Sequence, residues 1–409
     1  MTANNSPQLT PIEQALESLL AAMKVVTQEQ IVPTARASGR VLARAMVSPI
    51  DVPPQANSAM DGYAVRSADL AGAPLRLAVS QRIAAGAVGT ELSTGTVARI
   101  FTGAPLPPGA DAVVMQENSE PHEEAVTLLQ AVAAGENVRP AGEDLRQGQE
   151  LFPAGHRLRP QDLGVLATAG IDEVTVTRPL RAAVMTTGDE LVRPGTPLRP
   201  GQIYNANVYT LTALLQALGV EVIDLGIVPD DEEQTRRALV NAAKSADCII
   251  STGGVSVGEE DYVRKAVMAS GSLALWKLAI KPGKPFAFGE VGGACFFGLP
   301  GNPVSTFVTF VLLVRPCLLA MSGCRRLAPL SLRVAAGFSR PRSAERQEYL
   351  RVALTAANGQ EPRLQPYDNQ SSGVSASLSG ADGLAIIPPH TAVAQDDRLV
   401  FIPFSELLH

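Results

Sequence analysis

The sequence predicts a multidomain protein of α/β plus β class. It should contain a central, mostly parallel α/β sheet domain, an inserted small β domain, a helical N-terminal segment and a C-terminal β-barrel. Three observations lead to this prediction. The chain has 409 residues, too many for one ordinary domain. Apolar strands alternate with amphipathic helices from residue 181 onward. Short β-like runs punctuated by Gly and Pro lie on either side of that region.

Composition limits the possible functions. Apolar residues make up 46% and charged residues 18% of the chain, which favours packed cores over disorder. The net charge is -6 without a long basic run, so no nucleic-acid partner is expected. The polar N-terminus lacks a secretory h-region, and the longest apolar stretch, 307–321, is short and broken by Arg315 and Pro316. Four cysteines without a C-x-x-C pair indicate reduced thiols, so we expect a cytoplasmic protein without membrane contact.

The first part of the chain combines helical and β patterns. A capping-box pattern at 10–13 and apolar residues at helical spacing from Ile12 to Met23 predict a first helix, and a second short helix is expected at 35–45. Beyond residue 54, short β-like runs and turns continue to 142, and helical character returns at 160–169. We therefore predict an N-terminal domain of residues 1–54 and 143–178, interrupted by an inserted β domain of residues 55–142.

Residues 179–326 alternate between strands and helices. Strands are expected at 181–187, 220–228, 247–251 and 294–298, and helices at 208–218, 229–245, 259–270 and from 303 onward. Such alternation predicts a mostly parallel sheet covered on both faces. Residues 327–409 return to short strands and turns, which predicts a compact C-terminal β-barrel.

Three expected strand ends carry glycine-containing turns: residues 186–190 form the first loop, 251–261 the second and 298–303 the third. In open α/β sheets, ligands bind beyond the carboxyl ends of the strands, where bare backbone amides favour phosphate. One such turn alone is more simply an ordinary tight turn, but three at one sheet edge favour a binding site. The candidate binding residues are Thr187, Gly188, Gly253, Gly254, Ser256, Gly258, Pro300, Gly301, Asn302 and Pro303.

Carboxylates crowd the same expected edge and would repel one another and any phosphate. A divalent cation with oxygen ligands would relieve both repulsions, which predicts Mg²⁺. The alternative is that these acids stabilise helix N-termini, and it accounts for Asp231 and at least one of Glu259 and Glu260. The acids concerned are Asp189, Glu190, Asp230, Asp231, Glu259, Glu260 and Asp261.

Lys277, Lys281 and Lys284 form the only local basic cluster near the expected sheet. Lys277 and Lys281 would share one face if they lay in one strand, which favours a role in binding anions. The alternative is a loop of solvated lysines. The four histidines are scattered, so a His-based zinc site is not expected.

Residues 254–258 match G-x-S-x-G, the nucleophile-elbow pattern of α/β-hydrolases, with Ser256 as nucleophile. Three acids follow directly and would disfavour an oxyanion, and the downstream histidines, His390 and His409, lie far along the chain. A serine hydrolase is therefore the weaker hypothesis. The P-loop and G-x-G-x-x-G patterns are both absent, so kinase-type and classical dinucleotide-binding functions lack support.

Eight segments in order along nearly the whole chain resemble the molybdopterin molybdenumtransferase family, which includes the C-terminal domain of gephyrin. They are NSAMDGYAVR from Asn57, FTGAPLPPGADAVVMQE from Phe101, RPAGED from Arg139, TTGDEL from Thr186, VPDD from Val228, STGGVSVGEEDY from Ser251, WKLAIKPGKP from Trp276 and GLPGNPVS from Gly298. One departure is visible. The family often has Asp-Ser-Asn where this chain has Asn205-Ala206-Asn207, which puts a role for a hydroxyl at 206 in doubt.

The resemblance implies an enzyme that takes adenylylated molybdopterin and molybdate, releases AMP and yields molybdenum cofactor with Mg²⁺. It implies a sheet domain of molybdopterin-binding type and an elongated homodimer. The cleft is then shared between the sheet domain of one subunit and the inserted β domain of the other. Expected protein partners are the molybdopterin adenylyltransferase and downstream cofactor-handling proteins. Two alternatives stay open: the adenylyltransferase activity itself, and a non-catalytic dimeric scaffold.

The resemblance also points to individual residues. The matching functional positions are Asp61, Thr102, Asp144, Glu190, Asp230, Asp261, Lys277, Lys281, Pro300 and Pro303. Glu190, Asp230 and Asp261 are the expected metal ligands, with Glu190 and Asp230 also placing the diphosphate. Asp61, Asp144 and Asp261 are expected to orient molybdate or the attacking oxygen. Lys277 and Lys281 are expected to neutralise phosphate and molybdate.

Overall fold

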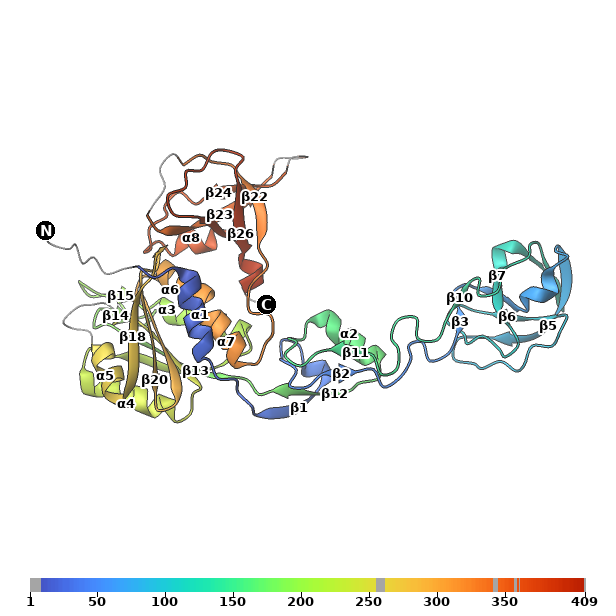
Figure 1. Cartoon of the computed structure of the whole chain (residues 1–409), viewed down its shortest axis with the longest axis horizontal. Helices are drawn as coiled ribbons and strands as arrows, with labels where there is room; N and C mark the ends of the chain where they lie inside the picture. Colours follow the sequence, from blue (N-terminus) through green and yellow to red (C-terminus); the bar gives the residue numbers. More distant parts are fainter. Residues whose placement is uncertain (1–8, 255–261, 341–344, 357–358, 360, 408–409) are drawn as a thin grey trace.

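The computed structural model describes residues 9–254, 262–340, 345–356, 359 and 361–407. The molecule is elongated (Figure 1). At one end the central sheet domain lies beside the C-terminal barrel, and at the other end lies the inserted β domain, with a narrow stalk between them. The predicted class, several domains of α/β and β type, is confirmed.

A six-stranded mixed sheet with the order β16-β13-β17-β21-β20-β18 forms the central domain. The first four strands in this order are parallel, and β20 and β18 continue the sheet with antiparallel pairing. The strands are β13 (Arg181–Thr187), β16 (Glu221–Val228), β17 (Cys248–Thr252), β18 (Gly271–Lys277), β20 (Pro285–Val291) and β21 (Ala294–Leu299). The mostly parallel sheet is confirmed, whereas the sequence reasoning missed the antiparallel β18 and β20.

Helices cover both faces of this sheet. On one face lie α3 (Asn207–Ala217) and α6 (Pro303–Thr309), and on the other lie α4 (Glu232–Ala243) and α5 (Tyr262–Ser270). Alternate residues of β13 enter two separate cores, because successive side chains of a strand point to opposite faces. Val184 packs on the side of α3 and α6, and Met185 on the side of α4 and α5. With both faces buried, the strand ends are the natural place for a ligand.

A long helical run crosses the core of the central domain. It comprises α6, a π-helical turn at Phe310–Val314 and α7 (Arg315–Met321). The long helix predicted from residue 303 onward is confirmed, since a π-helical turn precedes Pro316 and the helix continues beyond it. Within the described residues, Pro303–Met321 is the one helix with the length and composition to cross a membrane, and 83% of its apolar window is buried inside the molecule. A helix that is buried to this extent belongs to the core of the domain.

The predicted N-terminal helix is present as α1 (Ile12–Ala22), and it packs on the long helical run rather than on the stalk. The expected capping box does not form. Pro11 occupies the N-cap position, and no side-chain hydrogen bond caps the helix. Thr10 instead pairs with the segment after β18, donating from its amide to Lys277 O over 2.8 Å and accepting from Ala279 N over 2.8 Å.

The stalk consists of two short antiparallel pairs and one helix. The pairs are β1 (Glu29–Pro33) with β12 (Glu173–Thr177) and β2 (Met46–Val47) with β11 (Glu150–Phe152), and the helix is α2 (Pro160–Thr168). The helix predicted at 35–45 is wrong, since only a 3₁₀ turn forms at Thr34–Arg36. Gly39 has a φ of +77°, and Leu42 then pairs with Val176 across the stalk. The backbone groups of this segment thus find partners outside a helix.

The inserted β domain contains a six-stranded sheet with the order β7-β4-β6-β5-β9-β8. Its strands are β4 (Gly62–Val65), β5 (Leu75–Ile83), β6 (Thr96–Ile100), β7 (Ala112–Met115), β8 (Ser119–Pro121) and β9 (Ala125–Leu128). Two apolar clusters pack against this sheet. The chain enters and leaves the domain through the pair β3 (Asn57–Ser58) and β10 (Val138–Arg139).

Five strands close into the predicted C-terminal barrel. They follow the ring order β23-β24-β22-β26-β25, and β25 pairs back with β23. The strands are β22 (Leu332–Ala336), β23 (Gln347–Thr355), β24 (Arg363–Pro366), β25 (Gly383–Ile387) and β26 (Arg398–Pro403). The short strand β19 (Ile280–Lys281) leaves the central domain and pairs in parallel with β23. This pairing ties the barrel to the sheet domain.

Candidate active site

The structure brings the three predicted loops together. β13, β17 and β21 are parallel neighbours, so their carboxyl ends share one edge of the sheet. The amide of Gly253 donates to Leu299 O over 3.2 Å, which joins the second loop to the third. A Cβ atom at Gly253 would lie 2.8 Å from Thr187 O, so the first loop touches the second as well. Thr187, Gly253, Gly254, Pro300, Gly301, Asn302 and Pro303 therefore surround one place.

Glycine is required at the centre of this edge. Gly253 and Gly254 have φ values of +92° and +64°, which side-chain-bearing residues rarely adopt. A Cβ at Gly254 would also lie 2.6 Å from the Val263 side chain. At both positions a side chain would meet neighbouring atoms, so glycine lets the second loop pack closely against Thr187 and α5. Ser256, Gly258 and Asp261, which follow in the predicted loop, lie outside the described residues.

Asn207, which the sequence reasoning did not select, links two of the loops. It is the first residue of α3, and its Nδ2 donates to Thr252 Oγ1 and to Gly301 O, both over 2.7 Å. Two residues earlier, the buried Asn205 donates from Nδ2 to Thr186 Oγ1 over 2.8 Å. The segment that departs from the family pattern thus holds the ends of β13, β17 and β21. The signal in the sequence was an asparagine on either side of Ala206, ahead of an apolar helix.

The carboxylates of the first loop face the loop after β16. The amide of Asp189 donates to Asp230 Oδ2 and the amide of Asp230 donates to Asp189 Oδ1, each over 3.3 Å. The Glu190 carboxylate folds back over Gly188, where a Cβ would collide with it. Asp231 caps α4 by accepting from Gln234 N over 2.8 Å, so the helix-capping alternative is correct for Asp231.

The acids can supply oxygen ligands to a metal ion, although they do not form a closed cluster. Within the described ranges, no group of three or more His, Cys, Asp and Glu side chains is arranged to hold a metal. Glu190 and Asp230 belong to adjacent loops at the end of the parallel strands β13 and β16. Carboxylate oxygens are the donors that Mg²⁺ prefers. The donor chemistry of this edge therefore suits that ion.

The lysine segment departs from its expected geometry. Lys277 ends β18 and Lys281 ends β19, and these strands belong to different sheets, so the expectation of one shared strand face is wrong. The backbone turns between them because the segment leaves the central sheet to join the barrel. A Cβ at Gly283 would lie 2.7 Å from the Thr309 side chain, so the turn packs against α6, the helix that follows the third loop.

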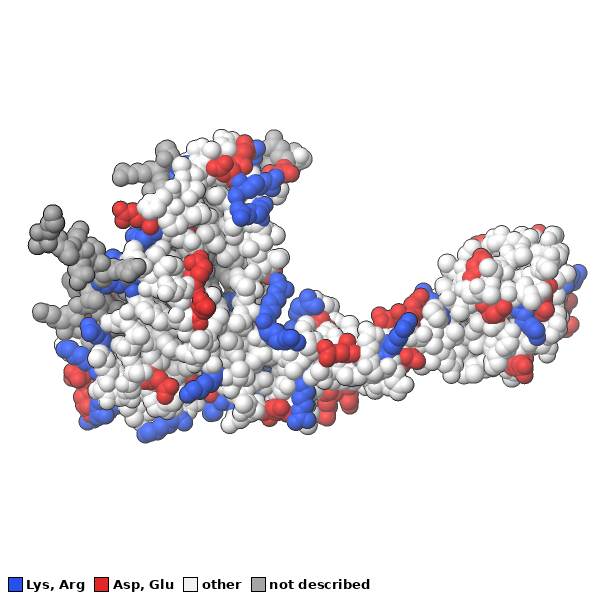
Figure 2. All heavy atoms as spheres, viewed as in Figure 1, with Lys and Arg blue, Asp and Glu red and all other residues white. Residues whose placement is uncertain are grey.

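Lys281 is paired with an acid from the barrel. Its Nζ lies 3.3 Å from Glu348 Oε1, and Arg340 Nη1 lies 2.6 Å from Glu348 Oε2. The Glu348 side chain is 4% exposed and that of Lys281 is 49% exposed, so the ammonium group remains accessible to an anion. On the face seen in Figure 2, acidic and basic side chains are interspersed, without one broad basic surface. The lysine segment supplies positive charge where the sheet domain joins the barrel.

Asp61 and Thr102 form a contact within the inserted β domain. The amide and the hydroxyl of Thr102 both donate to Asp61 Oδ1, each over 2.8 Å. These hydrogen bonds hold the pKa of Asp61 below its ordinary value, and the bond from the Thr102 amide has the largest effect. The nearby charge of Arg99 lowers the pKa further. Asp144 is exposed in the segment that returns to the stalk, where its amide donates to Val52 O over 2.9 Å. Within one chain, the inserted β domain and the segment between β10 and β11 lie apart from the central sheet (Figure 1).

Comparisons with known proteins agree with this architecture. Three family models match in order: the MoeA N-terminal region (domain I and II) over residues 10–170, a probable molybdopterin binding domain over 183–320, and the MoeA C-terminal region (domain IV) over 333–403. The molybdopterin molybdenumtransferase of Haemophilus influenzae is 42% identical over 76% of this chain and 78% of its own. That of Nostoc is 34% identical over 93% of this chain and 90% of its own. The chain belongs to the molybdopterin molybdenumtransferase family.

Solved structures show the same fold. A molybdopterin biosynthesis MoeA protein from Pyrococcus horikoshii superposes with a TM-score of 0.84, at 29% identity, over 97% of this chain and 100% of its own. A second structure from that organism gives a TM-score of 0.78 at 32% identity, over 97% and 99% of the two chains. Membership of the molybdenumtransferase family removes support from the serine hydrolase hypothesis, which rested on the G-x-S-x-G match at residues 254–258.

Proposed function

We propose that this chain inserts molybdenum from molybdate into adenylylated molybdopterin, with release of AMP and formation of molybdenum cofactor. The observation that carries the proposal is the meeting of three glycine-containing loops at one edge of the sheet, in which Lys277 ends the strand β18. Relatives that match most of the chain bear the name of this transferase activity. Backbone amides and ammonium groups at one edge suit a substrate that presents a diphosphate.

The groups at the loops support cleavage of the adenylate. Release of AMP breaks a phosphorus–oxygen bond, and negative charge grows on the departing phosphate. The backbone amide of Gly254 and the ammonium groups of Lys277 and Lys281 can neutralise that charge. Molybdate is itself an oxyanion, and the half-exposed Lys281 is the cation we assign to it. The dithiolene of the pterin then holds the metal, so the protein needs no cysteine ligand.

We assign Mg²⁺ to Glu190 and Asp230, together with Asp261 from outside the described residues. When bound, the ion supplies positive charge that stabilises the diphosphate during bond cleavage. Asp61, Asp144 and Asp261 are assigned to orienting molybdate or the attacking oxygen. The lowered pKa of Asp61 suits an acceptor that stays ionised, because its oxygen is already held by Thr102.

We further propose a homodimer in which the inserted β domain of one copy completes the site of the other. The long stalk supports the idea, because the inserted β domain, to which Asp61 and Thr102 belong, lies at the opposite end of the molecule from the sheet domain (Figure 1). A mixture of Asp61→Ala and Lys281→Ala chains should then recover activity that each variant lacks alone. If mixed subunits form and activity does not return, the shared site is refuted.

The reaction would take place in the cytoplasm, with the molybdopterin adenylyltransferase as donor and downstream cofactor-handling proteins as acceptors. Four free cysteines agree with a reducing compartment. The adenylyltransferase activity itself is not favoured, since the flanking domains exceed what a single sheet domain would need. A scaffold without catalysis does not explain why so many acids and lysines of the family motifs are retained.

The test measures AMP release from adenylylated molybdopterin with Mg²⁺, in the presence and absence of molybdate. Product is scored by reconstitution of a molybdenum-free reductase. Molybdate-dependent AMP release with active cofactor is expected, and chelation of Mg²⁺ should abolish it. Substrate binding without AMP release would refute the proposed activity and would favour the non-catalytic scaffold instead.

A further inference from the structure

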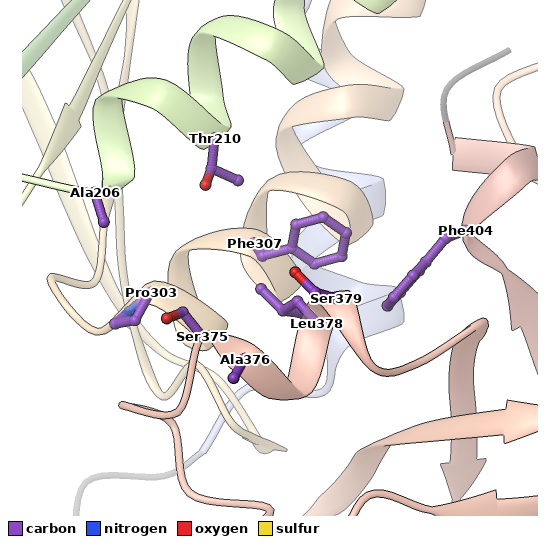
Figure 3. A pocket seen from close by; sticks show the side chains of 9 residues that line it. All are labelled: Ala206, Thr210, Pro303, Phe307, Ser375, Ala376, Leu378, Ser379 and Phe404. Carbon is purple, nitrogen blue, oxygen red and sulfur yellow. The ribbon is translucent and has the colours of Figure 1, made fainter.

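A cavity of about 480 Å³ lies beside the third loop, between the sheet domain and the barrel (Figure 3). Its walls come from α3, from α6 and from the barrel segment that includes α8 (Ala376–Ser379) and η5 (Phe404–Leu407). Pockets for small ligands commonly measure about 300–1,000 Å³ and often lie between domains. Both the size and the place of this cavity therefore suit part of a small molecule.

The cavity is continuous with the loop that closes the sheet edge. Pro303, the last residue of the third loop, lines the cavity, and so does Ala206. Asn207, next to Ala206, donates to Gly301 O over 2.7 Å. A ligand held by phosphate at the loop could therefore extend a further group past Pro303 into the cavity.

The chemistry of the walls favours a flat, uncharged group. Phe307 and Phe404 face each other edge to face, with ring centroids 5.1 Å apart and an interplanar angle of 70°. Hydroxyls of Thr210, Ser375 and Ser379 lie among these apolar surfaces. Among the described residues that line the cavity, none is charged. Such a mixture suits an aromatic heterocycle with a few polar edge atoms, and it does not suit a phosphate.

The barrel wall is fixed before any ligand arrives. Arg351 is 1% exposed, and its guanidinium donates from Nε to Ser377 Oγ over 3.1 Å and from Nη2 to Ser371 O over 3.2 Å. The amide of Val304 on α6 donates to Ser372 O over 3.0 Å, which joins this wall to the sheet domain. A preformed wall reduces the entropy that a ligand must lose on binding.

We propose that this cavity binds a bicyclic nitrogen heterocycle of the substrate, while the adjoining loops hold its diphosphate. The inference rests on the proposed function, because adenylylated molybdopterin carries two such rings, the adenine and the pterin. Both are flat, aromatic and edged with hydrogen-bonding nitrogen atoms. The shared chemistry follows from the walls, and the experiment identifies which ring is the occupant.

The test fills the cavity and compares ligands with and without a ring. Ala376 is exposed and lines the cavity, so Ala376→Phe should occupy the space with little effect on folding. Ala392→Phe is the matched control, an exposed alanine of the same barrel that does not line the cavity. Calorimetric titrations with AMP, neopterin and inorganic pyrophosphate are made on the full chain. Thr210→Leu, on the opposite wall, repeats the test if Ala376→Phe alters the melting temperature.

The wild-type chain should bind AMP or neopterin. The cavity-filling variants should bind that ligand with at least tenfold lower affinity. Pyrophosphate binding should be unchanged in these variants, and the control should bind all ligands as the wild type does. If the variants lose affinity for AMP, adenine is the occupant of the cavity. If they lose affinity for neopterin, the pterin is the occupant. Unchanged ring binding in both filled variants, or no ring binding by the wild type, would overturn the inference. Molybdate-dependent AMP release by the wild type is scored separately, so failure of the proposed function is distinguishable.

Discussion

Replacement of Asn207 is expected to loosen the candidate site more than it destabilises the fold. Its Nδ2 group makes two hydrogen bonds of 2.7 Å, to Thr252 Oγ1 and Gly301 O, and so connects α3 to two loops. Asn207→Ala removes both. The Thr252 hydroxyl keeps a contact of 3.3 Å with Pro300 O, so the strand end is not left without partners. The perturbation therefore falls mainly on the position of the third loop.

The size of the effect follows from the number and exposure of these bonds. A hydrogen bond contributes a net of about 0.5–1.5 kcal/mol, and a lost partner costs least where water can replace it. The bond to Gly301 O lies in an exposed setting, so we take about 1–2 kcal/mol for the pair. If this loss appears in substrate binding, the KM rises about 5- to 30-fold, since about 1.4 kcal/mol corresponds to a factor of ten.

Asn207→Asp separates positioning from helix stability. A carboxylate keeps the shape of the side chain and suits the N-terminus of α3, where negative charge stabilises a helix by about 0.3–1 kcal/mol. It cannot donate to Gly301 O. We therefore expect a melting temperature no lower than that of the wild type, together with a raised KM.

The assay is steady-state AMP release, with thermal unfolding measured in parallel. Gln216→Ala, at an exposed position of the same helix, is the control and should change neither quantity. The reasoning fails if both variants keep the wild-type KM within about twofold. It also fails if Asn207→Asp loses stability as much as Asn207→Ala does, because the asparagine would then act on the helix alone.

Three further predictions concern other parts of the molecule. Gly253→Ala should destabilise the protein by about 1–3 kcal/mol in urea unfolding, because its φ is +92° and a Cβ would meet backbone at 2.8 Å. Gly164→Ala, in α2 with open space around it, should instead stabilise by about 0.5–1 kcal/mol. Asp61→Asn should lower AMP release at every pH above the ordinary pKa of an aspartate, without moving the acid limb of the profile. The lowered pKa of Asp61 keeps the wild-type carboxylate ionised. The contribution of this carboxylate to AMP release is lost only as the pH falls below the ordinary pKa of an aspartate. Lys281→Ala should weaken molybdate binding at least tenfold in equilibrium dialysis, while Lys244→Ala, at the end of α4, should not.

Each of these predictions has a result that would contradict it. Equal effects of the two glycine substitutions would show that backbone conformation at Gly253 is not limiting. An acid limb near neutral pH that disappears in Asp61→Asn would assign proton transfer to that carboxyl group. Unchanged molybdate affinity in Lys281→Ala would remove this lysine from the binding of molybdate and leave it only its pairing with Glu348.

Local patterns in the sequence were sufficient for the central sheet edge. Apolar runs of strand length, each ended by a glycine-containing turn, located β13, β17 and β21. Parallel pairing then required their carboxyl ends to meet, and the structure brings Thr187, Gly253 and Gly301 together. Short β-like runs punctuated by Gly and Pro predicted the barrel and the inserted β domain in the same way. These features depend on residues that are near one another in the chain.

Features that depend on distant partners were missed or wrong. The helix expected at 35–45 does not form, because its backbone pairs with the returning strand of the stalk some 130 residues later, as in Leu42 with Val176. Lys277 and Lys281 separate because β19 pairs with the barrel strand β23 and not with the central sheet. Neither pairing leaves a trace in local periodicity.

By itself, the sequence determined the class of fold, the family and the set of chemically active residue types. Only the tertiary structure decided which of them meet. It paired Asp61 with Thr102 at the end of a long stalk, and it placed Asn207 on Gly301, 94 residues away. The physical reason is that strand and turn patterns report local backbone preference. A hydrogen bond between distant residues depends on how whole elements pack, which one residue's neighbours in the chain do not specify.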